Sequence, residues 1–160
     1  MGREDRGKVW LAVAGVVTSN NGEWLVVKKK YGGLKNKWSF PAGFVEHNET
    51  LDEAILREVY EETGIACEIE GMIGLRTGVI SNDISDNMVL FSLKAQSEEI
   101  VIQEKELYDA AFISPDDLVK DPDSSILLIR FSQKELQNRK MYDDINPGSQ
   151  FGYTKYKLFL

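Results

Sequence analysis

The 160-residue sequence has only one cysteine, Cys67, and only one histidine, His47. A single cysteine excludes an internal disulfide and a metal site built from several cysteines. Cys67 lies in the segment ACEIE, where it is typical of a small strand residue rather than a nucleophile. A lone histidine in a polar loop, such as His47, is usually exposed and uninvolved in chemistry. Any reaction that this chain catalyses must therefore depend on other side chains.

Long apolar runs are also missing. No stretch of 18 or more apolar residues is present, so we expect no membrane span. The N-terminal segment MGREDRGKVW lacks the apolar core of a signal peptide, and Arg6 stands where a myristoylation signal needs serine or threonine. The net charge of −7 argues against binding to long nucleic acids. We therefore expect a cytoplasmic protein without a membrane or a long nucleic acid as partner.

The length and composition favour a single domain over residues 1–160, because 42% of the residues are hydrophobic and no linker or repeat divides the chain. Apolar runs bounded by turn signals predict strands over 9–18, 23–28, 37–40, 67–80, 87–94, 110–113 and 152–160. Helical patterns cover 51–63 and 124–137, with a further helical turn after Ser114. Strands before, between and after two helices indicate an α/β sandwich with a mixed sheet.

The clearest local pattern lies in the helix predicted over 51–63. Thr50 followed by Glu53 forms a capping-box pattern, and apolar residues then recur at helical intervals. Gly64 suits the left-handed conformation that ends many helices. The helix is therefore bounded at both ends by residues with a physical role.

Three carboxylates, those of Glu58, Glu61 and Glu62, share one face of this helix because they are related by i, i+3 and i+4. Glu61 and Glu62 also lie near the negative end of the helix dipole, which disfavours anions. A hard divalent cation offsets this repulsion, since Mg²⁺ prefers oxygen ligands and shares them with substrate phosphates. A solvated acidic helix face is the alternative for an isolated pattern of this kind.

The residues around these carboxylates decide between the two interpretations. Gly43 is followed by five residues and Glu49, and Glu49 by seven residues and the run REVYEETGI, which extends from Arg57 to Ile65. This spacing is the complete Nudix box, so the chain resembles the Nudix hydrolases. The resemblance implies the Nudix fold, an α/β/α sandwich with a mixed β-sheet. It also implies Mg²⁺-dependent cleavage of a nucleoside diphosphate linked to another moiety.

The resemblance implies roles for individual residues. Glu58 and Glu62 are the leading metal ligands, and Glu61 is either a third ligand or the catalytic base. The carbonyl of Ala42 resembles the main-chain ligand of the family, because the glycine that follows, Gly43, lets the backbone approach an ion closely. The expected cofactor is Mg²⁺, or Mn²⁺ in its place.

Two further features of the family have counterparts here. Arg57 is expected to pair with Glu49 and hold the loop against the helix, in a bidentate contact that suits a guanidinium. A free surface arginine is the alternative. Many relatives carry another catalytic glutamate on a later loop, and Glu106, then Glu104, are the candidates. Ordinary loop charge is the alternative for each of these two glutamates.

Basic and aromatic residues precede the acidic helix. The lysines in this region are Lys28, Lys29, Lys30, Lys35 and Lys37. A polyanionic ligand held by metal on one side needs cations on the other, so we take Lys28 and Lys37 as substrate contacts. A solubilising run on an edge strand is the alternative. Phe44 is expected to stack on a base, whereas Trp38 is assigned to the core.

The sequence does not single out one substrate. The segment WSFPAGFVE resembles Nudix enzymes that act on nucleotide sugars or dinucleotides. However, no proline lies between Pro41 and Pro115, where ADP-ribose enzymes carry one shortly after the box. The tyrosine of dinucleoside polyphosphate hydrolases is missing too, since Tyr60 is followed next by Tyr108. No SQPWPFP-like segment marks an NADH pyrophosphatase, and nucleoside triphosphates stay open.

We therefore predict a Mg²⁺-dependent hydrolase that cleaves the diphosphate linkage of a nucleotide sugar, a dinucleotide or a nucleoside triphosphate. The alternative is a nucleotide-sensing regulatory module on the Nudix fold. Sensor members often lose box glutamates, whereas this chain keeps all of them. Isoprenoid diphosphate isomerisation would need a suitably placed cysteine, and Cys67 is misplaced for that role. The expected partner is a small nucleoside diphosphate derivative, and a homodimer is compatible with the resemblance.

Overall fold

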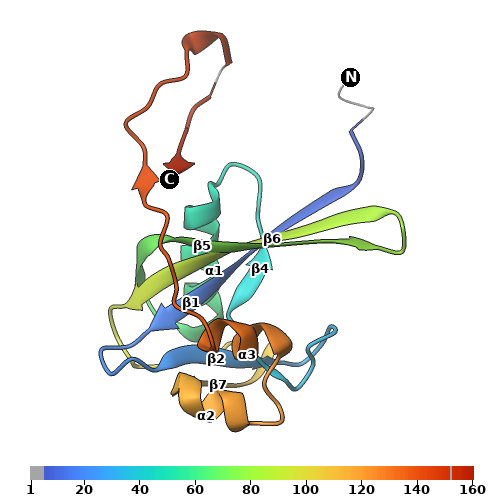
Figure 1. Cartoon of the computed structure of the whole chain (residues 1–160), viewed down its shortest axis with the longest axis vertical. Helices are drawn as coiled ribbons and strands as arrows, with labels where there is room; N and C mark the ends of the chain where they lie inside the picture. Colours follow the sequence, from blue (N-terminus) through green and yellow to red (C-terminus); the bar gives the residue numbers. More distant parts are fainter. Residues whose placement is uncertain (1–5, 152) are drawn as a thin grey trace.

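A computed structural model describes residues 6–151 and 153–160 (Figure 1). Residues 1–5 and Gly152 lie outside the described residues. The predictions for the N-terminal segment, for the single domain over 1–160 and for the strand over 152–160 therefore fall partly on residues that are not described. None of the helices in the described ranges has the length and hydrophobicity needed to pass through a bilayer.

Seven strands form one mixed sheet in the order β3-β2-β1-β6-β5, with β4 paired to β1 and β7 paired to β2. β1 and β6 are parallel, and the other pairs are antiparallel. The strands are β1 (Val9–Thr18), β2 (Trp24–Lys29), β3 (Trp38–Ser39), β4 (Ala42–Phe44), β5 (Cys67–Ile80), β6 (Ile84–Ala95) and β7 (Leu107–Ile113).

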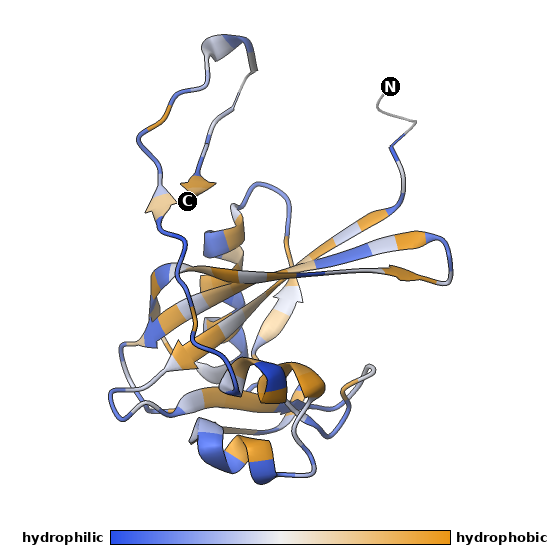
Figure 2. Cartoon of the chain, in the orientation of Figure 1, coloured by the Kyte–Doolittle hydropathy of each residue, from blue (hydrophilic) through white to orange (hydrophobic). Residues whose placement is uncertain are grey.

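Helices cover both faces of this sheet: α1 (Leu51–Thr63) on one face, and α2 (Pro115–Lys120) and α3 (Ile126–Ser132) on the other. Alternate side chains of β1 divide between the faces because strand residues point to opposite sides. Val13 and Val17 pack with α1, whereas Ala14 and Val16 pack with α2 and α3. Figure 2 shows the hydrophobic residues concentrated in the strands between these layers. The predicted α/β/α sandwich is confirmed.

The helix that carries the acidic residues occupies the predicted range. Gly64 ends it with a left-handed φ of 71°, and its N–H donates to the carbonyl of Tyr60 at 2.8 Å. The predicted capping box is wrong in detail. The Thr50 side chain accepts no cap hydrogen bond, and its hydroxyl instead donates to Glu53 Oε1 at 2.7 Å.

Other elements also differ from the prediction, and β7 begins at Leu107 rather than at position 110. β6 begins at Ile84 rather than at position 87, because Ser81 and Asn82 adopt positive φ angles of 54° and 56° in a tight hairpin turn. The helix predicted over 124–137 is limited to α3, which begins after Ser125. The hydroxyl of Ser125 accepts from the N–H of Leu128. β4 was not predicted, and it pairs with β1.

The C-terminal segment forms a separate two-stranded sheet of β8 (Met141–Tyr142) and β9 (Leu158–Phe159), with a short 3-10 helix at Ser149–Phe151 between them. β9 is all that appears of the strand predicted over 152–160. In Figure 1 this segment extends beyond the sandwich and returns towards α1. Phe159 packs edge-on against Phe91 of the core with ring centroids 5.3 Å apart.

Candidate active site

Gly43 allows the backbone of β4 to lie directly against α1. A Cβ atom added at this position would lie 2.1 Å from the carboxyl carbon of Glu58, which is far inside van der Waals contact. Any larger residue would have to displace the carboxylate or the strand. Glycine therefore brings Glu58 next to the peptide that follows Ala42.

Arg57 connects the loop that precedes α1 to the helix. Its Nε and Nη2 donate to the two carboxylate oxygens of Glu49 at 3.0 and 2.7 Å, which is the predicted bidentate contact. Nη2 also donates to the carbonyl of Phe44 at 3.1 Å. Nη1 donates to Glu58 at 2.8 Å and to Glu61 at 3.2 Å. The Arg57 guanidinium holds the pKa of Glu49 below its ordinary value.

Glu62 is the most buried carboxylate of the site, with 1% of its surface exposed. Its Oε1 lies 3.0 Å from Lys29 Nζ, and its Oε2 has no hydrogen-bond partner among the described residues. Burial raises the pKa of Glu62 to about 7, against the opposing effect of Lys29. Burial also raises the pKa of Glu58, although Arg57 opposes the shift. The charged forms of both side chains are thus costly where they lie.

Lys29, at the end of β2, joins two parts of the site. Its ammonium donates to the carbonyl of Ala42 at 2.6 Å while it pairs with Glu62. Lys29 was not among the predicted substrate contacts. The strand period of two would have identified it, because Lys29 lies four residues after Leu25, which packs with α1.

These groups fit a hard divalent cation. Two carboxylates and a backbone carbonyl are ligand types that Mg²⁺ prefers. The unpartnered buried oxygen of Glu62 is costly until a cation or a proton binds it. Among the described residues, no three carboxylate, imidazole or thiol groups converge on one point. Lys29 pairs with Glu62, and Arg57 pairs with Glu58.

The sequence model of the NUDIX domain matches residues 8–133. The chain belongs to the Nudix family. It is 29% identical over 140 residues to human nucleoside diphosphate-linked moiety X motif 6, in an alignment that covers 85% of this chain and 44% of that protein. It is 37% identical over 65 residues to the ADP-ribose pyrophosphatase of Methanocaldococcus jannaschii, covering 41% of this chain and 38% of that one. The chain thus spans less than half the length of these relatives.

Solved structures of Nudix proteins share the fold. The MutT protein of Methanosarcina mazei superposes with a TM-score of 0.67 at 19% identity, over 80% of this chain and 93% of that one. The NUDIX domain of Shewanella oneidensis NrtR, solved with ADP ribose, gives a TM-score of 0.66 at 16% identity, over 83% and 92%. At these identities the likeness concerns the fold alone.

The remaining acidic candidates of this Nudix domain are more exposed than Glu58 and Glu62. The side chain of Glu61 is 57% exposed and contacts Arg57. Glu106 is exposed, and its charge contributes to the raised pKa of Glu62. Glu104 is also exposed, and its carbonyl accepts a hydrogen bond from Lys30 Nζ. Glu61 and Glu106 are therefore accessible to solvent while Glu62 is not.

The two lysines predicted as substrate contacts are not brought to the acidic group. Lys28 Nζ lies 4.7 Å from the centroid of the Trp38 ring and 3.3 Å from Asp123 Oδ2. Trp38 belongs to the core on the α2 and α3 side, away from α1. Lys37 is exposed and donates to the carbonyl of Pro122 at 3.3 Å. Among these lysines, only Lys29 is recorded in contact with Glu62.

Phe44 follows Gly43 directly and leaves 57% of its surface exposed. Its ring packs edge-on against Trp10, with centroids 5.8 Å apart, and Trp10 is itself 43% exposed. The two rings form an accessible aromatic surface beside the box loop. By contrast, Cys67 is half-buried, and burial raises the pKa of its thiol to about 12, which disfavours the nucleophilic thiolate.

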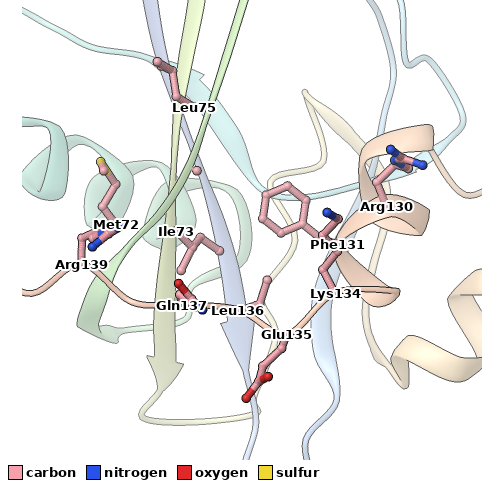
Figure 3. A pocket seen from close by; sticks show the side chains of 11 residues that line it. Met72, Ile73, Leu75, Arg130, Phe131, Lys134, Glu135, Leu136, Gln137 and Arg139 are labelled. Atoms are coloured by element: carbon pink, nitrogen blue, oxygen red, sulfur yellow. The ribbon is translucent and has the colours of Figure 1, made fainter.

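A cavity of about 490 Å³ lies between β5 and the segment from α3 to Arg139 (Figure 3). Its lining includes the apolar side chains of Ile73 and Phe131 and the charged side chains of Arg130 and Lys134. None of the site residues predicted from the sequence lines this cavity. The glutamates of α1 therefore belong to a site that is separate from this cavity.

Proposed function

We propose that this Nudix protein hydrolyses the diphosphate linkage of a nucleoside diphosphate derivative, using Mg²⁺ or Mn²⁺. The observation that carries the proposal is the buried Glu62, whose free oxygen lies in a group completed by Glu58 and the Ala42 carbonyl. An ADP-ribose pyrophosphatase and an NAD-capped RNA hydrolase among the relatives support this reaction class.

In this proposal Glu58, Glu62 and the Ala42 carbonyl hold the cation. When bound, it would neutralise charge on the diphosphate and make an attacking water more acidic. Arg57 acts as a positioning residue, because one guanidinium orients both Glu58 and the loop residue Glu49. These residues fix the donor atoms before substrate arrives, so little reorganisation is needed during the reaction.

A general base must take the proton of the attacking water, and two carboxylates are accessible for it. Glu61 lies one residue before Glu62 on α1 and is held from one side only, by Arg57. Glu106 lies on the loop before β7, near enough for its charge to act on Glu62. Glu61 is also available as a third ligand. Separate Glu61→Gln and Glu106→Gln variants distinguish the two, since loss of the base removes the corresponding limb from the pH–rate profile.

We assign the aromatic surface of Phe44 and Trp10 to the base of the nucleotide. Exposed rings stack on any base, because every base has a π-face. Phe44 is the residue after Gly43, so a base stacked there lies beside the proposed cation site. Lys28 and Lys37 contact other groups, and Lys29 is the lysine that pairs with Glu62.

A homodimer in the cytoplasm is part of the proposal. β5 is the last strand of its sheet, and with β1 and β6 it projects beyond the helical layers (Figure 1). Val9, Leu75 and Val79 on these strands are each more than 60% exposed. An apolar edge strand in this state favours association with another chain. Light scattering after size exclusion should give twice the monomer mass, and a monomer at micromolar concentration would remove this part of the proposal.

The alternative is a nucleotide-sensing module that binds without cleaving. A panel of compounds separates the two functions: ADP-ribose, NADH, a nucleotide sugar, a dinucleoside polyphosphate and nucleoside triphosphates. Each is incubated with Mg²⁺, with Mn²⁺ or with EDTA, and the products are identified by mass spectrometry. We expect metal-dependent release of a nucleoside monophosphate from at least one compound. Tight binding of one compound without cleavage of any would establish the sensor instead.

A further inference from the structure

Lys29 makes two contacts with oxygens that the proposed metal site needs. Its ammonium lies 2.6 Å from the Ala42 carbonyl oxygen and 3.0 Å from Glu62 Oε1. The side chain of Lys29 is only 23% exposed, and that of Glu62 is 2% exposed. The pair is therefore shielded from water and from salt, unlike a surface ion pair.

The alternation of side chains along β2 places Lys29 at this point. Successive residues of a strand point to opposite faces of the sheet. The neighbouring Lys28 and Lys29, paired with Asp109 and Leu107 of β7, therefore serve opposite sides of the sheet. Lys28 lies over Trp38 on the α2 and α3 side, whereas Lys29 meets Glu62 of α1.

The charges of the two buried glutamates are compensated differently. Glu58 is paired with the guanidinium of Arg57. Within the described part of the chain, Lys29 is the only cation recorded in a salt bridge with Glu62. An ammonium is a compact charge with three donors, so it can serve a carbonyl and a carboxylate together. It therefore binds the same two oxygen types that a hard cation binds.

We propose that Lys29 takes the place of the divalent cation in the metal-free protein and competes with it for Ala42 and Glu62. This inference rests on the proposed metal site. The ammonium keeps the carbonyl and the buried carboxylate together, and an incoming ion displaces it from both. The affinity for metal is consequently lower than the oxygens alone would give, and Lys29 acts as a positioning residue.

The test is calorimetric titration with Mn²⁺, in the absence of nucleotide, of the wild type and Lys29→Met. Loss of the competing ammonium should lower the Kd by about tenfold. Lys28→Met is the matched control, because it removes the same charge from the adjacent residue, whose contacts are with Trp38 and Asp123. Its Kd should stay within about twofold of the wild type, since it is not in contact with the site.

Thermal unfolding without metal gives a second measurement. Lys29→Met should lower the Tm of the EDTA-treated protein, because Glu62 loses the only salt-bridge partner recorded for it among the described residues. Adding Glu62→Gln to that variant should restore most of the loss, since the uncompensated charge is gone. Lys29→Gln keeps a donor for the Ala42 carbonyl, and it replaces Lys29→Met in both measurements if the latter does not fold.

The outcomes separate this inference from the proposed function. If neither the wild type nor the Lys29 variants bind Mn²⁺, the proposed metal site itself is wrong. If the wild type binds Mn²⁺ and the Lys29 variants bind it equally or more weakly, the site stands and the competition is refuted. Tighter binding by the Lys29 variants alone, with Lys28→Met unchanged, supports the inference.

Discussion

The carboxyl group of Glu58 occupies the space where residue 43 would carry a side chain. A Cβ atom at Gly43 would lie 2.1 to 2.4 Å from the carbon and both oxygens of that carboxyl group. The carboxyl group of Glu58 can lie at this point only because residue 43, at the start of the box, has no side chain. This contact links a sequence pattern to the geometry of the proposed cation site.

Gly43→Ala should therefore displace Glu58 or shift β4. We expect a loss of about 1–3 kcal/mol in the free energy of unfolding, the usual cost of forcing atoms into a filled space. The metal-dependent turnover should fall by about tenfold or more, because reacting groups tolerate little displacement. Gly78→Ala is the control, since Gly78 lies in β5 with no atom within 4 Å of the added Cβ. Equal behaviour of the two variants in urea unfolding and kinetics would contradict the role of Gly43.

Arg57→Lys keeps the positive charge and tests the geometry of the guanidinium. A lysine cannot reproduce the two parallel bonds to Glu49 together with the bond to Glu58. We expect kcat to fall by about 10- to 100-fold with Mg²⁺ saturating. Arg76→Lys serves as the control, because Arg76 pairs with Asp86 on the exposed hairpin. Wild-type kcat in Arg57→Lys would show that charge alone suffices.

The stability of the metal-free protein should depend on the protonation of Glu62. Burial raises its pKa from 4.5 to about 7, so between these values the folded state binds more protons than the unfolded state. The free energy of unfolding must then fall as the pH rises through this window, by up to about 3 kcal/mol. Glu53, whose pKa is lowered to about 2 by Lys155, contributes its change below pH 4.5 instead.

Urea unfolding in EDTA at pH 5.0 and pH 7.5 measures this effect. The wild type should be less stable at the higher pH, and Glu62→Gln should lose most of the difference, because the amide does not titrate. A wild-type protein that gains stability between the two values would contradict the placement of Glu62.

Lys157 of the C-terminal segment should stabilise the start of α1. Its ammonium lies 2.6 Å from Asp52 Oδ2 and 3.0 Å from Thr50 Oγ1, and Asp52 is 4% exposed. Lys157→Met leaves that buried carboxylate without a cation, so we expect a loss of about 2–4 kcal/mol in urea unfolding. Lys155→Met is the matched control: Lys155 pairs with the more exposed Glu53, and its loss should cost below about 1 kcal/mol. Similar losses in both variants would show that burial at Asp52 does not matter.

The sequence predicted best those helices and strands in which the spacing of the apolar residues and the residues at the ends indicate the same element. The ranges of α1, β1 and β5 match their predictions, and Gly64 ends α1 as expected. The prediction made β6 too short and the turn before it too long. Ser81 and Asn82 form a tight turn with positive φ angles although neither is a glycine. β9 is shorter than predicted, since its pairing with β8 covers only two residues on each strand.

The resemblance to the Nudix box also implied the contact between Arg57 and Glu49, which the structure contains. The box does not include β2, so it did not predict which lysine approaches the carboxylates. The alternation of β2 side chains contains that information, because Lys29 and Leu25 are four residues apart and Leu25 packs with α1. The charge cluster alone does not separate Lys29, which contacts Glu62, from Lys28, which does not.

The most direct measurement is the turnover of Glu62→Gln on the compound that the wild type cleaves, at saturating Mg²⁺. Loss of this carboxylate should lower kcat by about 10²- to 10³-fold. The circular dichroism spectrum should be unchanged, and the exposed Glu68→Gln on β5 should retain wild-type turnover. A folded Glu62→Gln protein with wild-type kcat would show that the buried carboxylate of α1 does not hold the catalytic cation.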